Sequence, residues 1–202
     1  MTSARLAAIV WIMGATVYLG SEAVSAARAG GYSYAGDFIS DLGVVPVMNI
    51  GGFIVHGVLF LVGALVIAGA GAWGSGVGRA FVASATANMV GNVMVGLFHS
   101  GTAQAQWHVL GAGLAILGGN AAVITGGIGS RAFGAGHGFR RASIVLGSFG
   151  IICLVVLIAD AADGSHALPP GVVERGSVYP IIAWELLAAA ALIVRGADAR
   201  RS

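Results

Sequence analysis

The chain has 202 residues, of which 57% are hydrophobic and 9% are charged, and its mean hydropathy is +0.92. This composition, which includes 34 glycines, excludes an ordinary water-soluble domain and indicates a protein surrounded mostly by lipid. The net charge is +2, and all of the basic residues are arginines. No run exceeds two arginines and no aromatic residues are interleaved with them, so the charge does not indicate a nucleic-acid-binding patch.

Six segments are apolar over the roughly 20 residues that an α-helix needs to cross a hydrocarbon core about 30 Å thick. They run approximately over residues 5–27, 47–70, 80–98, 105–128, 142–160 and 178–196. The sequence therefore predicts an all-α polytopic membrane protein, a bundle of six transmembrane helices that forms a single integral membrane domain over residues 1–202. We interpret the first segment as a retained helix, because removing it as a signal peptide would leave five spans.

The arginines predict the orientation of these spans. When the spans alternate in direction, two arginines, Arg28 and Arg175, fall on one side of the membrane. Eight fall on the other side: Arg5, Arg79, Arg131, Arg140, Arg141, Arg195, Arg200 and Arg201. Because short basic loops stay inside the cell, we expect a multi-pass protein of the cell membrane with both termini in the cytoplasm.

The connection between the first two spans contains the stretch GDFISDLG, residues 36–43. Asp37 is a suitable N-cap, Ser40 and Asp41 follow it at helical spacing, and Gly43 can end the turn before Pro46. We predict a short interfacial helix here, with Asp37, Ser40 and Asp41 on a shared face that covers a pocket below it.

Polar residues recur inside the spans at helical spacing. Asn49 and His56 are seven residues apart and should share one face of the second span. In the third span Asn88 and Asn92 lie on one stripe with Ser84 and His99. Side chains at such depth avoid lipid, which predicts an outward-opening polar pocket among spans 2, 3, 4 and 6. The candidate ligand-binding residues are Asp37, Ser40, Asp41, Asn49, His56, Asn88, Asn92, His108, Glu174, Arg175 and Glu185.

Small residues also recur at four-residue spacing, as at Gly111, Ala115 and Gly119. Such faces let membrane helices approach closely. They predict a compact bundle, and they also leave open a non-catalytic subunit that docks a second copy of the chain or a partner membrane protein through its glycine-rich helix faces.

Four local motifs resemble a known family. FISDLG (38–43), MNIGGFIVHG (48–57), VGLFHSGTAQAQWHVLGAG (95–113) and GVVERGSVYPIIAWELLAA (171–189) are similar to the bacterial six-span membrane proteins of domain of unknown function 998. More distantly, the ISDLG loop resembles the eukaryotic damage-regulated autophagy modulators and their relatives, which are linked to lipid handling. The resemblance implies the fold and the topology, and it implies no settled reaction.

The same polar residues support more than one function. Membrane lipids are the first expected partners: Asn49, Asn88 and Asn92 offer neutral donors and acceptors, and Arg175 could clamp a phosphate or carboxylate. Alternatively, Glu174 and Arg175 pair with each other or with Asp41 and only fix the loops. A coupled ion pathway is disfavoured, because few ionisable groups continue toward the cytoplasmic side.

A zinc-dependent membrane hydrolase is the enzymatic alternative. Its metal ligands would be His56, His99 and His108, with Ser40 and Asp41 nearby to assist an attacking water. This set is loosely similar to that of the alkaline ceramidase and adiponectin-receptor group. That group has seven spans and a close histidine pair on one late helix, whereas His99 and His108 are nine residues apart across a loop. The sequence alone leaves open whether the protein is an enzyme.

Overall fold

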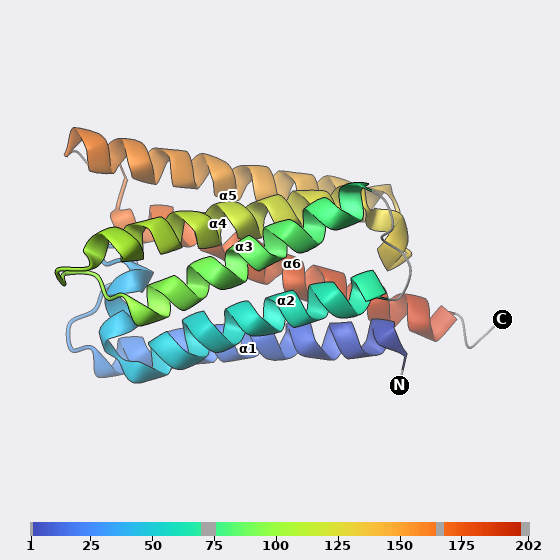
Figure 1. Cartoon of the computed structure of the whole chain (residues 1–202), viewed down its shortest axis with the longest axis horizontal. Coiled ribbons are helices and arrows are strands. Elements are labelled where there is room, and N and C mark those ends of the chain that lie inside the picture. The colour runs from blue at the N-terminus through green and yellow to red at the C-terminus, as the bar shows by residue number, and fades with distance from the viewer. Residues whose placement is uncertain (1, 70–75, 165–167, 199–202) are drawn as a thin grey trace.

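The structure, a computed structural model, describes residues 2–69, 76–164 and 168–198 (Figure 1). Six helices are long and apolar enough to cross a membrane, and the described residues contain no strand, which confirms the predicted all-α, six-span fold. The elements are α1 (Ser3–Arg28), η1 (Ile39–Val44), η2 (Met48–Val55), α2 (His56–Ile67), α3 (Gly76–Leu97), α4 (Ala105–Ile128), η4 (Ser130–Phe133), α5 (His137–Asp163) and α6 (Pro170–Asp198). Arg200, Arg201 and the predicted end of the second span at residue 70 lie outside the described residues.

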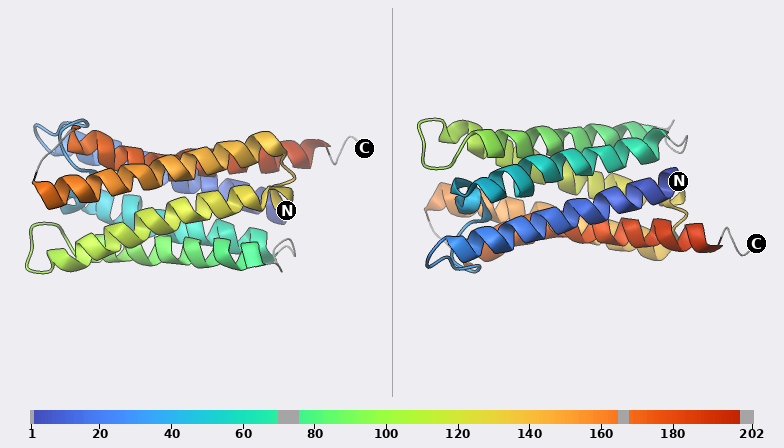
Figure 2. Two further views of the ribbon diagram at one scale, coloured as in Figure 1. Left: turned by 90° about the horizontal axis from the view of Figure 1, so that it is seen from above. Right: turned by 90° about the horizontal axis from the view of Figure 1, so that it is seen from below.

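The six long helices form a ring in chain order. Each packs against the next, and α6 closes the ring by packing against α1 (Figure 2). Because the helices alternate in direction, the chain enters and leaves the bundle at the same end (Figure 1). Large apolar side chains on the outside of the ring, among them Val145, Phe149 and Ile152 of α5, are exposed as expected for a surface that faces lipid.

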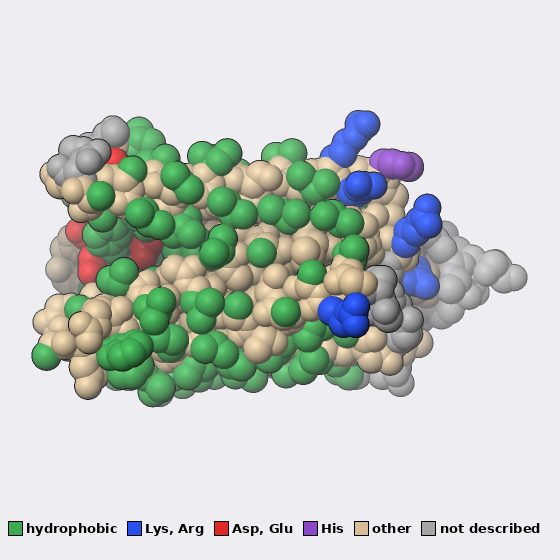
Figure 3. All heavy atoms as spheres, turned by 45° about the horizontal axis from the view of Figure 1, so that its top comes forward, with side chains coloured by type: hydrophobic (Ala, Val, Ile, Leu, Met, Phe, Trp, Pro, Cys, Tyr) green, Lys and Arg blue, Asp and Glu red, His purple; other side chains and the backbone are tan. Residues whose placement is uncertain are grey.

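Charge separates the two ends of this bundle. Figure 3 shows arginines at the end that carries the chain termini and acidic side chains at the opposite end. We call the first the arginine-rich end, defined by Arg5, Arg79, Arg131, Arg140, Arg141 and Arg195. The second is the acidic end, defined by Glu22, Asp37, Asp41 and Glu174.

The last helix begins earlier than predicted. The expected span started at residue 178, whereas α6 starts at Pro170, so Glu174 and Arg175 lie inside the helix instead of before it. Proline is favoured in the first helical turn, where its missing N–H has no intrahelical partner to lose. Glu174 and Arg175 made this stretch look like a loop in the sequence, because the groups they contact, described below, come mostly from distant parts of the chain.

The second span begins as a π-helix. Residues Met48–Val55 of η2 lead without a break into α2 at His56. A π-helix closes its hydrogen bonds over five residues instead of four, so side chains seven apart no longer align. The prediction that Asn49 and His56 share a face is therefore wrong: Asn49 bonds His99 beyond the end of α3, while His56 points toward Glu185 of α6.

Small residues bring α3 and α4 into close contact, as their spacing predicted. A side chain at Gly91 would collide with the backbone of Gly111 and Ala115, and Gly119 lies against Ile181 of α6. Helices surrounded by lipid gain no hydrophobic free energy when they associate, so close van der Waals contact of this kind is what stabilises the pair. The face that carries Gly111 and Ala115 is thus buried inside this chain.

Aromatic side chains fill the ring toward the arginine-rich end. Trp11, Phe60, Phe81, Phe133 and Trp184 are fully buried there. Trp11 and Trp184 meet edge to face, with ring centroids 5.4 Å apart, and each indole N–H has a hydrogen-bond acceptor. The space inside the ring that remains for polar chemistry therefore lies in the acidic half.

Candidate functional site

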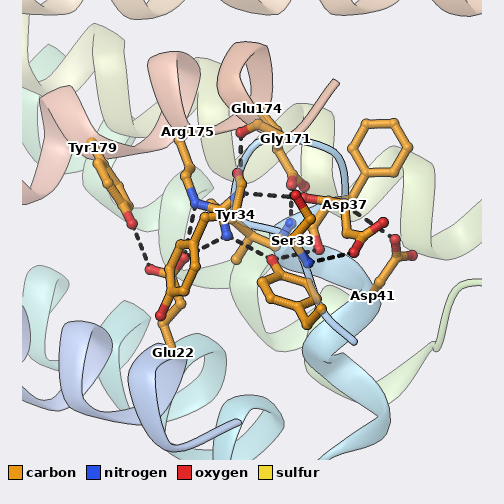
Figure 4. A network of polar contacts seen from close by, with 12 residues as sticks. Glu22, Ser33, Tyr34, Asp37, Asp41, Gly171, Glu174, Arg175 and Tyr179 are labelled. Carbon is orange, nitrogen blue, oxygen red and sulfur yellow. Dashed lines mark hydrogen bonds and ion pairs between the residues drawn. The ribbon is translucent and has the colours of Figure 1, made fainter. Parts of the chain in front are cut away.

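A buried ion pair connects α6 to α1 at the acidic end. Arg175 donates from Nε and Nη2 to Oε1 of Glu22, at 3.1 and 2.8 Å (Figure 4). The other oxygen of Glu22 accepts from the Tyr179 hydroxyl at 2.9 Å. The candidate residues chosen from the sequence do not include Glu22. Its one usable signal was that Glu22 is the only acidic or basic residue between Arg5 and Arg28 of the first span, where charged groups seek partners.

The same guanidinium also holds the segment between α1 and η2, which we call the first connection. Nη1 of Arg175 donates to the carbonyl oxygens of Tyr34, Asp37 and Gly171, and Nη2 also donates to the Tyr32 hydroxyl at 2.6 Å. All three nitrogens are therefore engaged, and none is left for the phosphate or carboxylate clamp expected from the sequence. Arg175 fixes the loop, and it does so through Glu22 and backbone carbonyls instead of Glu174 or Asp41.

Tyr32 continues this network outside the spans. Its hydroxyl accepts from Arg175 and donates to the carbonyl of Phe38 at 3.0 Å. Burial raises the pKa of the Tyr32 phenol above its usual value of 10.0, although the neighbouring guanidinium acts in the opposite direction. The neutral phenol is the form that can donate to Phe38, so the geometry and the pKa direction agree.

Glu174 holds the short helix η1 from the other side. Its carboxylate accepts from the backbone N–H of Ile39 and, at 3.4 Å, from that of Ser40 (Figure 4). It thereby satisfies N–H groups at the start of η1 that have no partner within the helix. The expected N-cap, Asp37, does not have this role: its carboxylate accepts from Ser33 N at 2.7 Å, and Phe38 is the N-cap residue.

The polar face predicted for the short helix is split. The element is a 3₁₀-helix, with three residues per turn, so Ile39 and Leu42 lie on one side and both are buried. Of the three polar residues expected to cover a pocket, only Ser40 lines the cavity below η1. Asp37 and Asp41 line a separate depression on the surface.

A small cavity of about 50 Å³ lies beneath η1 inside the ring. Four of the predicted residues besides Ser40 line it, namely His56, Asn88, Asn92 and Glu174. The remaining walls are apolar except for the hydroxyl of Tyr18, and they are built from Tyr18, Ile39, Phe53, Val95, Ala112, Ala115, Ile116, Val178 and Ile181. Asn88 and Asn92 reach it together because α3 is a regular α-helix in which residues four apart share a face.

His56 and Glu185 form a second buried pair beside this cavity. Nε2 of His56 lies 3.0 Å from Oε2 of Glu185, and the exposed fractions of the two residues are 2% and 0%. Nδ1 of His56 and Oδ1 of Asn88 are buried and make no hydrogen bond to any residue that the structure describes. The amide nitrogen of Asn88 is used, since it donates to Ala115 O at 2.8 Å.

The three histidines considered as zinc ligands are held apart by their own partners. His56 bonds Glu185, His99 bonds Asn49, and Nδ1 of His108 donates to the Phe98 carbonyl at 2.8 Å. Within residues 2–69, 76–164 and 168–198 no three histidine, cysteine or acidic side chains are grouped so that they could hold a metal ion. The structure thus brings His56 to the cavity and leaves His99, His108 and Asn49 outside its walls.

Comparison with curated proteins finds no match, and comparison with solved structures finds none either. A family model described as "Protein of unknown function (DUF998)" matches residues 12–191, which include all six membrane-spanning helices at least in large part. With most of its length matched by that model, and with the six-span fold just described, the chain belongs to the DUF998 family of membrane proteins.

Proposed function

We propose that the protein binds a membrane amphiphile whose polar group donates hydrogen bonds, an alcohol or an amine, in the cavity beneath η1. The observation that carries this proposal is that two residues lining this mostly apolar cavity, His56 and Asn88, each have a buried polar atom without a partner among the described residues, Nδ1 and Oδ1. A buried polar atom without a hydrogen bond costs about 1–3 kcal/mol, which a donor from a ligand would recover. We also propose that the acidic end faces outward, with the arginine-rich end in the cytoplasm.

The charges around the cavity favour a donor over an anion. Glu174 lines it and Glu185 lies behind His56, while the guanidinium of Arg175 is fully engaged elsewhere. The Asn88 oxygen can only accept, and Nδ1 of a neutral His56 that donates from Nε2 to Glu185 also accepts. A phosphate or fatty-acid carboxylate would bring further acceptors and a like charge to this place.

The size of the cavity limits what enters it. A volume of about 50 Å³ holds a few water-sized groups, so a hydroxyl or ammonium group and its first carbons fit. The hydrocarbon tail would lie between helices or in the surrounding lipid, as membrane amphiphiles do. The polar group of the bound molecule would donate hydrogen bonds to His56 and Asn88.

A panel of amphiphiles with one chain length tests this proposal. Purified protein is heated in neutral detergent with a long-chain alcohol, the corresponding amine or the corresponding fatty acid. A ligand present at a hundredfold excess over its Kd stabilises the folded state by about 2.7 kcal/mol. We expect the alcohol or the amine to raise the unfolding temperature, and stabilisation by the fatty acid alone would contradict the proposal.

Two matched variants locate the site. Ala112→Leu fills part of the cavity from α4, whereas Ala183→Leu makes the same change at an exposed position of α6. The alcohol or amine should stop stabilising Ala112→Leu and should still stabilise Ala183→Leu. Equal ligand stabilisation of both variants would place binding somewhere other than this cavity.

A further inference from the structure

A second hollow lies at the opposite end of the molecule, between α5 and α6. It is an open groove of about 690 Å³, within the range of roughly 300–1,000 Å³ that is typical of ligand pockets. Its lining is almost entirely apolar and mostly small, and it includes Ala135, Gly138 and Ala142 on one side and Ala190, Ala191 and Arg195 on the other. The small side chains of both helices leave room that a neighbouring helix of this chain does not fill.

Positive charge surrounds this groove. Arg195 contributes directly to its lining, and Arg141 lies three residues after Gly138, on the adjoining strip of the α5 surface. Arg131 and Arg140 are exposed at the same end, where Figure 3 shows the basic side chains gathered. The first-turn amides of α5 add partial positive charge, since its N-cap, Gly136, offers no side-chain acceptor.

The position of the groove decides the kind of occupant. Most of its lining residues belong to the membrane-spanning segments His137–Ala162 and Pro170–Gly196, so lipid is the molecule next to it. An apolar groove in a membrane helix pair takes a hydrocarbon chain, and the arginines at its end complement a phosphate that carries negative charge. A free phosphate would use the arginines but leave the apolar length of the groove empty.

We propose that this groove binds an anionic phospholipid, with one acyl chain between α5 and α6 and its phosphate beside Arg195 and Arg141. The site is separate from the cavity beneath η1, and it selects the opposite chemistry. It does not depend on the amphiphile proposed for that cavity, because no residue lines both.

Lipid binding to the full chain tests the proposal. The protein is purified in neutral detergent and titrated with phosphatidylglycerol or with phosphatidylcholine of the same acyl chains, and bound lipids are counted by native mass spectrometry. We expect tighter binding of phosphatidylglycerol. Arg195→Gln and Arg141→Gln should each weaken it about fivefold, the effect of roughly 1 kcal/mol per arginine at an anionic membrane surface.

Control variants separate this groove from the general basic surface. Arg79→Gln removes an exposed arginine at the same end that does not line the groove, and it should leave phosphatidylglycerol affinity unchanged. Ala190→Leu narrows the groove without changing its charge and should weaken binding of phosphatidylglycerol, whereas Ala183→Leu should not. If Arg195→Gln does not fold, Arg141→Gln and Ala190→Leu still decide the matter.

Three results would overturn the proposal: equal affinity for the two phospholipids, equal weakening by Arg79→Gln and Arg141→Gln, or full retention of phosphatidylglycerol by Ala190→Leu. The first would remove headgroup selection. The second would reduce the effect to net surface charge, and the third would place the acyl chain outside the groove.

Discussion

The ion pair between Arg175 and Glu22 should carry a large share of the stability of the acidic end. Arg175→Met keeps an apolar stem but removes every donor. The two residues are 8% and 2% exposed, so the carboxylate of Glu22 would stay buried without its cation. Losing one member of a buried pair costs about 3–5 kcal/mol, and we expect about 3, since Tyr179 would still donate to Glu22.

Unfolding by a denaturing detergent, followed through the fluorescence of the four tryptophans, measures this difference. The matched control is Arg28→Met, which removes an exposed arginine from the last turn of α1 at the same end. Exposed substitutions of this kind change stability by no more than about 0.5 kcal/mol. Hydrogen exchange adds a local readout, because the amides of Ile39 and Ser40 depend on a loop that Arg175 holds in place.

Two outcomes would refute this reasoning. If Arg175→Met and Arg28→Met unfolded at the same detergent concentration, the buried pair would contribute nothing that an exposed arginine does not. If Arg175→Met were destabilised while exchange at Ile39 stayed slow, Arg175 would stabilise the helices but not the first connection.

Three further predictions follow from the same geometry. Gly91→Ala places a methyl group against the α4 backbone and should destabilise the protein by about 1–3 kcal/mol in thermal unfolding, whereas Gly113→Ala, which meets nothing within 4 Å, should not. Because folding raises the pKa of Tyr32, its contribution to the free energy of unfolding is fully present below pH 10 and is lost as the pH rises through the folded pKa. Tyr32→Phe should therefore flatten the fall of stability with pH in this alkaline range. An unchanged slope of stability against pH would contradict this role of Tyr32. If the acidic end faces outward, Ser33→Cys should react with an impermeant maleimide on intact cells and His137→Cys only after permeabilisation, and the reverse pattern would invert the topology.

Much of the fold was predictable because lipid imposes a length and a composition on every span. Six apolar runs therefore yielded six helices in the right order. Part of the cavity was predictable for a related reason: Asn88 and Asn92 are four apart in a regular α-helix, and both reach the same cavity. Depth in the membrane and helical spacing are local properties that a sequence displays directly.

The rest depended on information that spacing does not contain. Asn49 and His56 separate because their segment is a π-helix, and Asp37 separates from Ser40 because the short 3₁₀-helix begins only at Ile39. In both places the prediction assumed a regular α-helix where the chain forms another structure. The partners of Arg175 come from α1, α6 and the first connection, so its engagement became visible only when these segments were placed together.

The π-helical start of the second span also has a consequence for how the protein tolerates changes in length. One π-helical turn holds about one residue more than an α-helical turn, so deleting one residue within Met48–Val55 and returning to α-helical geometry would leave the preceding segment facing in nearly the same direction. The His56–Glu185 contact and the position of η1 over the cavity would then survive. Inserting a further residue would instead rotate the preceding segment by roughly a quarter of a turn relative to His56, so this segment tolerates the loss of a residue better than the gain of one.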